Sequence, residues 1–465
     1  MLSSELVPSA GPGEVRNASS NDIRDTTAGT DANADKDSDG IAVKLVRGKN
    51  GRLDYVPRTR LLNDLSWAVG LMELANAGDF AANVWNEVPV PVYAVVFMAI
   101  GGTVAAAMCV VAFHDARLAC RNVRFLRRQR RDQKAERAAR QERGQSTLDL
   151  DVYLSVTFRE LGSEIVTRWL TNLLMGCGAL IISIGTFMAI GGANPTVWFA
   201  SNVLSGYLGN APIALYGVVT LLWASYVFCK AQGHIWATRR SLRGTKAAAL
   251  VRRRARTVQA FCVVNGTAAV LGGVASLLTA TQWWAYVMLI PVIAASVFCN
   301  VWWRRRVGYS RAKSPAGANE FPALSLANLV VEVESAARAG AAIRGRKASP
   351  IDEFVADPTS LAQVLRFLQR NMLLEVFCLK ACSVPHLCRA LGADQDTEVT
   401  IGVDQLLAVS KECQATLLEM ARECAEELGS ENLEYRQRYT AELLGTYCRL
   451  VGGVGGGSGI DVDEK

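Results

Sequence analysis

Five stretches of the chain are almost purely apolar, and polar sequence separates them. Each holds about the 20 residues that an α-helix needs to cross the hydrocarbon core of a bilayer. The predicted spans are residues 92–113, 169–190, 212–229, 258–280 and 284–303. The sequence therefore predicts an all-α, multi-pass transmembrane helical bundle of about five spans within residues 91–311.

A sixth hydrophobic stretch, Leu65 to Trp85, precedes the first span. It is long enough to cross a bilayer, but it carries Glu73 and Asp79. Carboxylates at the bilayer centre are costly unless they are partnered, so we expect an amphipathic or re-entrant helix over residues 63–90. A sixth span stays open as an alternative, because the basic segment before it favours a cytosolic start. If the stretch inserts, Glu73 and Asp79 become the candidate carboxylates for transport.

Basic residues cluster in the loops after spans one and three and directly after span five, whereas residues 191–211 and 281–283 carry no charge. The positive-inside rule places the basic sites in the cytosol. With five spans, the N-terminus then lies outside and the C-terminus in the cytosol. We expect anionic lipid headgroups to contact Arg124, Arg127, Arg128, Arg130, Arg131, Arg252, Arg253, Arg254, Arg304, Arg305 and Arg306. Nucleic acid is not an expected partner, because these blocks adjoin spans and lack interleaved stacking aromatics.

The two ends of the chain are polar. Residues 1–62 begin with a long run rich in Ser, Asp, Asn, Gly and Ala, and this composition predicts a disordered N-terminal tail. Residues 312–450 contain apolar positions at helical spacing, such as Leu361, Val364, Leu365 and Leu368. They predict a small cytosolic helical domain, and residues 323–450 would suit a protein partner. The glycine-rich residues 451–465 predict a flexible tail.

The overall charge of +7 is modest, and none of the 12 cysteines lies in the first ninety residues. This distribution does not fit a secreted disulfide framework. Cys378, Cys382, His386 and Cys388 form a candidate zinc site, since Cys378 and Cys382 share a helix face and the other two follow a helix-breaking proline. The alternative is that these cysteines are small apolar residues on a buried helix face.

No phosphate loop, dinucleotide-binding glycine motif, metalloprotease motif, nucleophile elbow or kinase set occurs in the sequence. We therefore predict no enzymatic activity, no catalytic residue and no cofactor. The five predicted spans contain no Asp, Glu, Lys or Arg. This absence counts against ion-coupled transport, which usually leaves ionisable groups in the membrane.

The block from Leu65 to Arg128 contains WAVGLMELANAGDFAANVWNEVPVPVYAVVFMAIGG followed by HDARLACRNVRFLRR. It resembles a group of uncharacterised multi-span integral membrane proteins from filamentous fungi. The resemblance implies a eukaryotic endomembrane or plasma-membrane protein, and it carries no functional residue across.

These patterns favour a membrane-embedded scaffold or regulator, with basic cytosolic helices on lipid and C-terminal helices on a partner. The alternative is a small-solute transporter or channel subunit, and it depends on whether Leu65 to Trp85 inserts.

Overall fold

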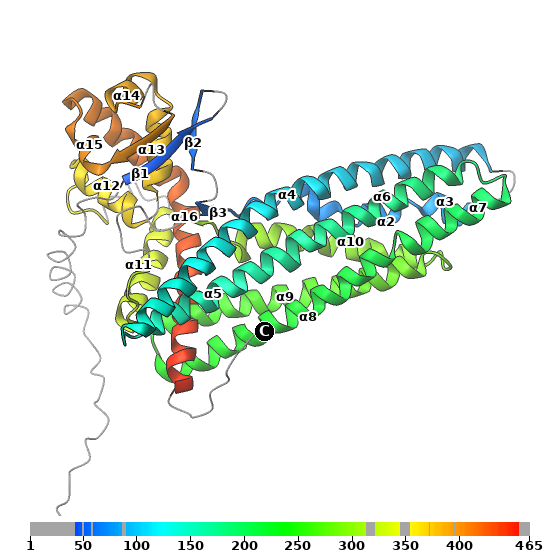
Figure 1. Cartoon of the computed structure of the whole chain (residues 1–465), viewed down its shortest axis with the longest axis horizontal. Coiled ribbons are helices and arrows are strands. Elements are labelled where there is room, and N and C mark those ends of the chain that lie inside the picture. The colour runs from blue at the N-terminus through cyan, green and yellow to red at the C-terminus, as the bar shows by residue number, and fades with distance from the viewer. Residues whose placement is uncertain are drawn as a thin grey trace, which may run out of the picture.

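The computed structural model describes residues 42–48, 51–56, 59–85, 90–312, 321–344, 354–371, 373–393 and 397–454. Long helices form an elongated bundle, and a smaller helical unit sits at one end of it (Figure 1). We call this end the basic end, because the arginine-rich loops lie there. Residues 1–41, the first part of the tail predicted to be disordered, and residues 455–465 lie outside the described residues.

Five helical stretches of the described residues are long and apolar enough to cross a membrane. They confirm the prediction of a mainly helical, multi-pass membrane protein. Short π-helical turns (η2, η3, η4) continue three of the helices without a break. The stretches are α4 (Val92–Glu142), α5–η2–α6 (Leu148–Ser163, Glu164–Leu170, Thr171–Ala189), α7–η3–α8 (Pro195–Asn202, Val203–Leu208, Ala211–Ser241), α9 (Lys246–Leu278) and α10–η4 (Ala285–Trp302, Trp303–Val307).

The helices are longer than the spans within them. Helix α4 has 51 residues, which at 1.5 Å per residue gives about 75 Å. The hydrocarbon core of a bilayer is about 30 Å thick. The arginine-rich second half of α4 therefore extends beyond the membrane, as its charge predicts.

The sixth hydrophobic stretch lies inside the bundle as three short helices, η1 (Trp67–Leu71), α2 (Leu74–Ala77) and α3 (Phe80–Val84). It starts at the basic end, where Asn122 donates a hydrogen bond to the carbonyl of Leu62. It ends at the opposite end, where the Trp85 ring packs 5.5 Å from the ring of Tyr93 at the start of α4. Within the described residues the chain thus runs between the two ends six times.

Residues 42–47, 53–55 and 60–61 form strands, although the sequence predicts a disordered tail there. The strands are β1 (Ala42–Arg47), β2 (Leu53–Tyr55) and β3 (Arg60–Leu61), and their partners from later in the chain are β4 (Arg311–Ala312) and β5 (Glu398–Gly402). Strand β1 pairs antiparallel with β2 and β5, with Val43 opposite Ile401, and β3 pairs with β4. Residues 42–47 therefore lie on the same side as the C-terminal unit. The five helical stretches long and apolar enough to cross a membrane agree with the predicted bundle of about five spans, and the sixth stretch runs beside them as short helical turns.

The C-terminal unit is helical, as predicted, and it holds its own core. Its helices are α11 (Leu326–Arg344), α12 (Leu361–Arg370), α13 (Leu374–Cys382), α14 (Pro385–Ala390), α15 (Val403–Ala408) and α16 (Lys411–Val454). Residues Leu361, Val364, Leu365 and Leu368 are all buried in that core, together with Leu45 of β1. The helical periodicity thus predicts the buried face of α12 correctly.

Helix α16 joins the two parts of the molecule. Its first half packs in the C-terminal unit, and its second half crosses the basic end of the bundle (Figure 1, red). There Leu444 and Cys448 share a core with Leu150 of α5 and Val251 of α9. The C-terminal unit is therefore anchored on the bundle by a helix buried between α5, α8 and α9.

Candidate functional site

The sixth hydrophobic stretch, Leu65 to Trp85, is called the interrupted segment below, because it forms three short helices and not one long one. Glycines allow this segment to fit between the long helices. The carbonyl of Gly78 lies directly against Gly101 of α4, and any Cβ at position 101 would overlap it. A Cβ at Gly70 would lie 3.0 Å from the Cβ of Asn300 in α10. Glycine also disfavours a continuous helix, which explains why the segment forms short turns. The glycine at position 101 of α4 thus packs against the sixth stretch inside this bundle.

Glu73 lies beside a cavity of about 90 Å³ inside the bundle. Its side chain is buried, with 4% exposure, and Oε2 accepts a hydrogen bond of 2.6 Å from Nδ2 of Asn76. A cavity of this size holds several water molecules or a small solute. The polar residues that line it are Glu73, Thr167, Arg168, Thr171, Tyr216, Asn265, Ser296 and Asn300.

Asp79 lies further along the segment and is completely buried. Its Oδ1 accepts a hydrogen bond of 2.8 Å from the Tyr286 hydroxyl of α10, and its Oδ2 accepts one of 3.0 Å from Asn83. Asn83 also donates to the Tyr286 oxygen at 2.8 Å. Among the described residues neither Asp79 nor Glu73 forms an ion pair. The two carboxyl groups are held by neutral donors, and the structure does not bring them into contact with each other.

Arg168 of η2 lines the same cavity and belongs to a buried network towards the basic end. Its Nε and Nη2 each lie 3.0 Å from an oxygen of Asp115 in α4. Its Nη1 lies 2.6 Å from Asp64 and 3.6 Å from Glu164. Asp115 also accepts a hydrogen bond from the backbone N–H of Ser66, at the start of the interrupted segment. This network therefore fixes the segment to α4 and η2 where it enters the bundle.

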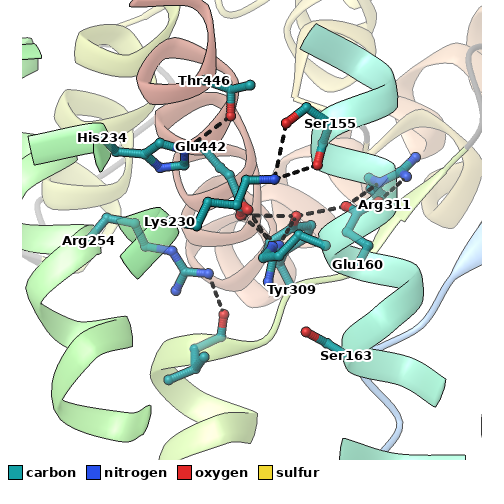
Figure 2. Close-up of polar contacts among 12 residues, drawn as sticks. Ser155, Glu160, Ser163, Lys230, His234, Arg254, Tyr309, Arg311, Glu442 and Thr446 are labelled. Carbon is teal, nitrogen blue, oxygen red and sulfur yellow. Dashed lines mark hydrogen bonds and ion pairs between the residues drawn. The ribbon is translucent and has the colours of Figure 1, made fainter. Parts of the chain in front are cut away.

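A second buried cluster lies where α16 crosses the bundle (Figure 2). Glu442 of α16 forms an ion pair with Arg159 of α5, and Glu160 forms one with Arg311 of β4. The Tyr309 hydroxyl donates to Glu160 at 2.7 Å and accepts from Arg159 at 2.8 Å, so it links the two pairs. Burial, together with the two carboxylates, raises the pKa of Tyr309 well above its usual value. The phenol is therefore a permanent hydrogen-bond donor in this cluster.

Lys230 and His234 of α8 complete the second cluster. Lys230 Nζ donates to the backbone carbonyl of Ser155 at 2.5 Å and to its hydroxyl at 3.1 Å. The imidazole of His234 lies 3.2 Å from the hydroxyl of Thr446 in α16. These contacts bind α5, α8 and α16 to one another.

Nine of the eleven arginines predicted to contact lipid headgroups are exposed: Arg124, Arg127, Arg128, Arg131, Arg252, Arg253, Arg304, Arg305 and Arg306. Arg130 is half-buried and lies over the ring of Phe158, 4.9 Å from its centroid. Arg254 does not fit the prediction. It turns inward and donates to the carbonyls of Arg306 and Val307 at 3.0 and 2.7 Å. Helical periodicity accounts for this, because Arg254 shares the buried face of Val251 and Val258.

The candidate zinc site is not assembled. Cys378, Cys382 and Cys388 are buried in the core of the C-terminal unit, whereas His386 is exposed. No group of three or more His, Cys, Asp or Glu side chains that could hold a metal ion occurs among the described residues. Burial raises the pKa of the Cys378 thiol, and it raises the pKa of Cys382 to about 12. These thiols therefore pack as small apolar residues, which is the alternative that the sequence left open.

The two charged networks were not predicted from the sequence. Glu160, Glu164 and Arg168 follow one another at helical spacing just before the second predicted span. Charges that recur on one face so close to a span are a signal of buried ion pairs. Arg311, the partner of Glu160, and Asp115, the partner of Arg168, lie far away in the sequence, so the pairing itself could not be derived.

Comparisons with known proteins found no match for this chain among family models, curated proteins or solved structures.

Proposed function

We propose that this membrane protein transports a small solute and that the cavity beside Glu73 is its binding site. The position of the interrupted segment carries this proposal. It places a buried carboxylate against a cavity of about 90 Å³ among helices that are apolar enough to cross a membrane.

Two physical arguments support transport. An ionisable group inside a membrane is costly, and such groups mark substrate and ion pathways when they are retained. Interrupted helices in a membrane are tolerated where their free backbone groups are covered by protein or line a cavity, and transporters bind substrates at such breaks. The segment from Trp67 to Val84 combines a buried carboxylate with a broken helix. The five predicted spans, in contrast, contain no Asp or Glu.

The lining of the cavity favours a small cationic or proton-linked solute. Glu73 supplies the one carboxylate, and Tyr216, Asn265 and Ser296 supply neutral hydroxyl and amide groups. Arg168 lines the cavity too, but its guanidinium is already paired with Asp115 and Asp64. The carboxylate of Glu73 is therefore the free charge that a solute meets.

We further propose that the basic end faces the cytosol, as the positive-inside rule predicts for its exposed arginines. The network around Arg168 would then close the cavity on the cytosolic side. Residues 42–47 and the C-terminal unit would lie in the cytosol together.

Reconstitution of the full chain into vesicles tests this proposal. Vesicles loaded with a pH-sensitive dye report proton flux, and matched vesicles with a sodium-sensitive dye or labelled methylammonium report cation flux. We expect at least one of these fluxes to exceed that of protein-free vesicles. The variant Glu73→Gln removes the charge and keeps the shape, so we expect it to reduce that flux by about tenfold or more.

The variant Asp404→Asn is the matched control, because Asp404 is an exposed carboxylate of the C-terminal unit. It should leave the flux unchanged. Transport through this cavity would be refuted if the proton, sodium and methylammonium fluxes all equalled those of protein-free vesicles. It would also be refuted if the Glu73→Gln variant showed the same flux as the wild type.

The second candidate function is the scaffold role that the sequence favours, and a cleft supports it. The cleft measures about 440 Å³ and lies between the C-terminal helices and the bundle, where Phe321, Asn328, Glu332, Arg436 and Tyr439 line it. A cleft with apolar and charged walls suits a peptide segment of a protein partner. The exposed arginine rows would hold anionic lipid beside it.

Deleting residues 323–450 would be a direct test of the scaffold role, but it would also remove Glu442 from the buried cluster. A point variant in the cleft is therefore the better test. Asn328→Trp fills the cleft, and Ala327→Trp places the same side chain on the exposed neighbouring position. A partner that co-purifies with the wild type and with Ala327→Trp, but not with Asn328→Trp, supports the role. Equal recovery with both variants contradicts it.

A further inference from the structure

A cavity of about 20 Å³ lies inside the second buried cluster, between α5, α8, α9 and α16. Its charged and polar lining consists of Arg159, Lys230, His234, Arg254 and Glu442, and apolar side chains close the remainder. This volume holds one water molecule or one monatomic ion, and it excludes phosphate or a lipid headgroup.

The charges around this cavity do not balance. Arg159 is paired with Glu442, and the neighbouring Arg311 is paired with Glu160. Lys230 and Arg254 form no ion pair with any carboxylate among the described residues. Even with the imidazole of His234 counted as neutral, the basic groups on the cavity wall outnumber the carboxylates by two. Burial lowers the pKa of Lys230 to about 7, so a bound anion is what would keep this ammonium charged beside Arg254. A buried charge without a partner costs several kcal/mol, so such an arrangement calls for an anion.

The same two cations retain unused hydrogen-bond donors. Lys230 has three N–H bonds, and two of them serve the carbonyl and hydroxyl of Ser155. Arg254 donates through Nη1 and Nη2 to backbone carbonyls, but its Nε is buried without a partner among the described residues. In Figure 2 the Lys230 ammonium of α8 points towards Ser155 and the Arg254 guanidinium of α9 points towards a backbone carbonyl, and both residues line the same cavity.

We propose that a halide ion, chloride under physiological conditions, binds in this cavity and accepts hydrogen bonds from Lys230 and Arg254. A halide fits the volume, accepts several N–H donors at once and halves the unbalanced charge. The carboxylate of Glu442 does not compete for these donors, because the guanidinium of Arg159 engages both of its oxygens.

The position of the ion gives it a structural role. The cavity is bounded by α8 and α9 of the bundle and by α16, which carries the C-terminal unit. A bound halide would therefore strengthen the attachment of α16 to the bundle. This inference is independent of the proposed transport, because the cavity beside Glu73 is lined by different residues.

Thermal unfolding of the full chain in nanodiscs of neutral lipid tests the proposal. The midpoint is compared in sodium chloride, sodium bromide and sodium gluconate at one ionic strength. Binding to the folded state alone raises stability with ligand concentration. We expect chloride and bromide to raise the midpoint by roughly 2–4 °C over gluconate, with saturation. Equal midpoints in the three salts would overturn the proposal.

Two variants separate this site from general salt effects. Arg254→Gln keeps a side-chain amide donor but removes the charge, and it should abolish the halide-dependent shift. Arg252→Gln changes an exposed arginine on the same helix, and it should keep the shift. A shift of equal size in both variants would assign it to surface arginines and overturn the proposal.

If Arg254→Gln does not fold, the wild-type protein still decides the matter. Crystals grown in bromide should show an anomalous peak within hydrogen-bond distance of Lys230 Nζ. Absence of that peak in bromide-saturated crystals would overturn the proposal.

Discussion

The ion pair between Arg168 and Asp115 gives the sharpest test of how the interrupted segment is held. Both side chains are buried, with exposures of 5% and 0%. The variant Arg168→Gln shortens the side chain and removes its charge, so Asp115 loses both of its contacts with the guanidinium. It keeps its hydrogen bonds from Asn172 and from the backbone N–H of Ser66.

The size of the effect follows from these contacts. Removing one partner of a buried ion pair costs about 3–5 kcal/mol. The remaining donors on Asp115 place the expected loss near the lower limit, about 3 kcal/mol. The lost contact with Asp64 adds little to this loss of stability, because the Asp64 side chain is 31% exposed and partly solvated.

Unfolding of the full chain in mixed micelles, followed by tryptophan fluorescence, measures this loss. The variant Asp115→Asn removes the opposite charge, so the double variant leaves no unpaired charge between the two positions. We expect the double variant to be at least about 1 kcal/mol more stable than the sum of the single effects predicts. Arg131→Gln changes an exposed arginine of α4 and should cost under about 0.5 kcal/mol.

Two results would refute this reasoning. A loss of less than about 1 kcal/mol for Arg168→Gln would mean that the pair is solvated. Strict additivity of the two single variants would mean that the side chains do not interact.

Three further predictions concern other parts of the molecule. Gly101→Ala places a Cβ on the carbonyl of Gly78, and it should lower the free energy of unfolding by about 1–3 kcal/mol, as overpacking does; an unchanged value would contradict the close contact. Because burial raises the pKa of Cys382 to about 12, its thiol stays protonated at pH 8. Iodoacetamide should therefore label the half-buried Cys413 while sparing Cys382 until the protein unfolds, as peptide mass spectrometry can show. Leu45→Asp buries a carboxylate in the core of the C-terminal unit and should cost about 3–5 kcal/mol; unchanged protease resistance of the β1 segment would count against the β1–β5 pairing.

The five long spans could be predicted because hydrophobic length is a local property of the sequence. The helices of the C-terminal unit could be predicted for a similar reason, since spacing at 3.6 residues marks the face that becomes buried. Leu365 and Leu368 are fully buried for this reason.

The position of the sixth stretch could not be derived in the same way. Its two carboxylates argue against insertion when the stretch is considered alone. Asn76 and Asn83 lie three and four residues from them and supply local donors. The decisive partner of Asp79 is Tyr286, on a helix more than two hundred residues later. Only the assembled bundle shows that the carboxyl groups are accommodated.

The inward orientation of Arg254, in contrast, could have been predicted from the sequence. Its neighbours Arg252 and Arg253 are exposed, and composition treats the three residues alike. The helical positions of Val251, Ala255 and Val258 indicate that Arg254 faces inward, so periodicity applied to charged residues could have separated it.

The pairing of β1 with β5 sets an order of events while the chain is made. Val43 leaves the ribosome long before Ile401, its partner across the ladder. At about 5–20 residues per second, the interval is on the order of tens of seconds. All the membrane helices are made during that interval.

During that time β1 has an open edge on the side where β5 will pair. An unpaired edge invites pairing with other chains, and exposed charge reduces that risk. Lys44 of β1 is exposed and carries such a charge. Strand β5 can pair with β1 only after the last membrane helix has been synthesised. A chain that stalls before residue 398 would therefore have all its membrane helices, while the edge of β1 could still pair with a strand of another protein.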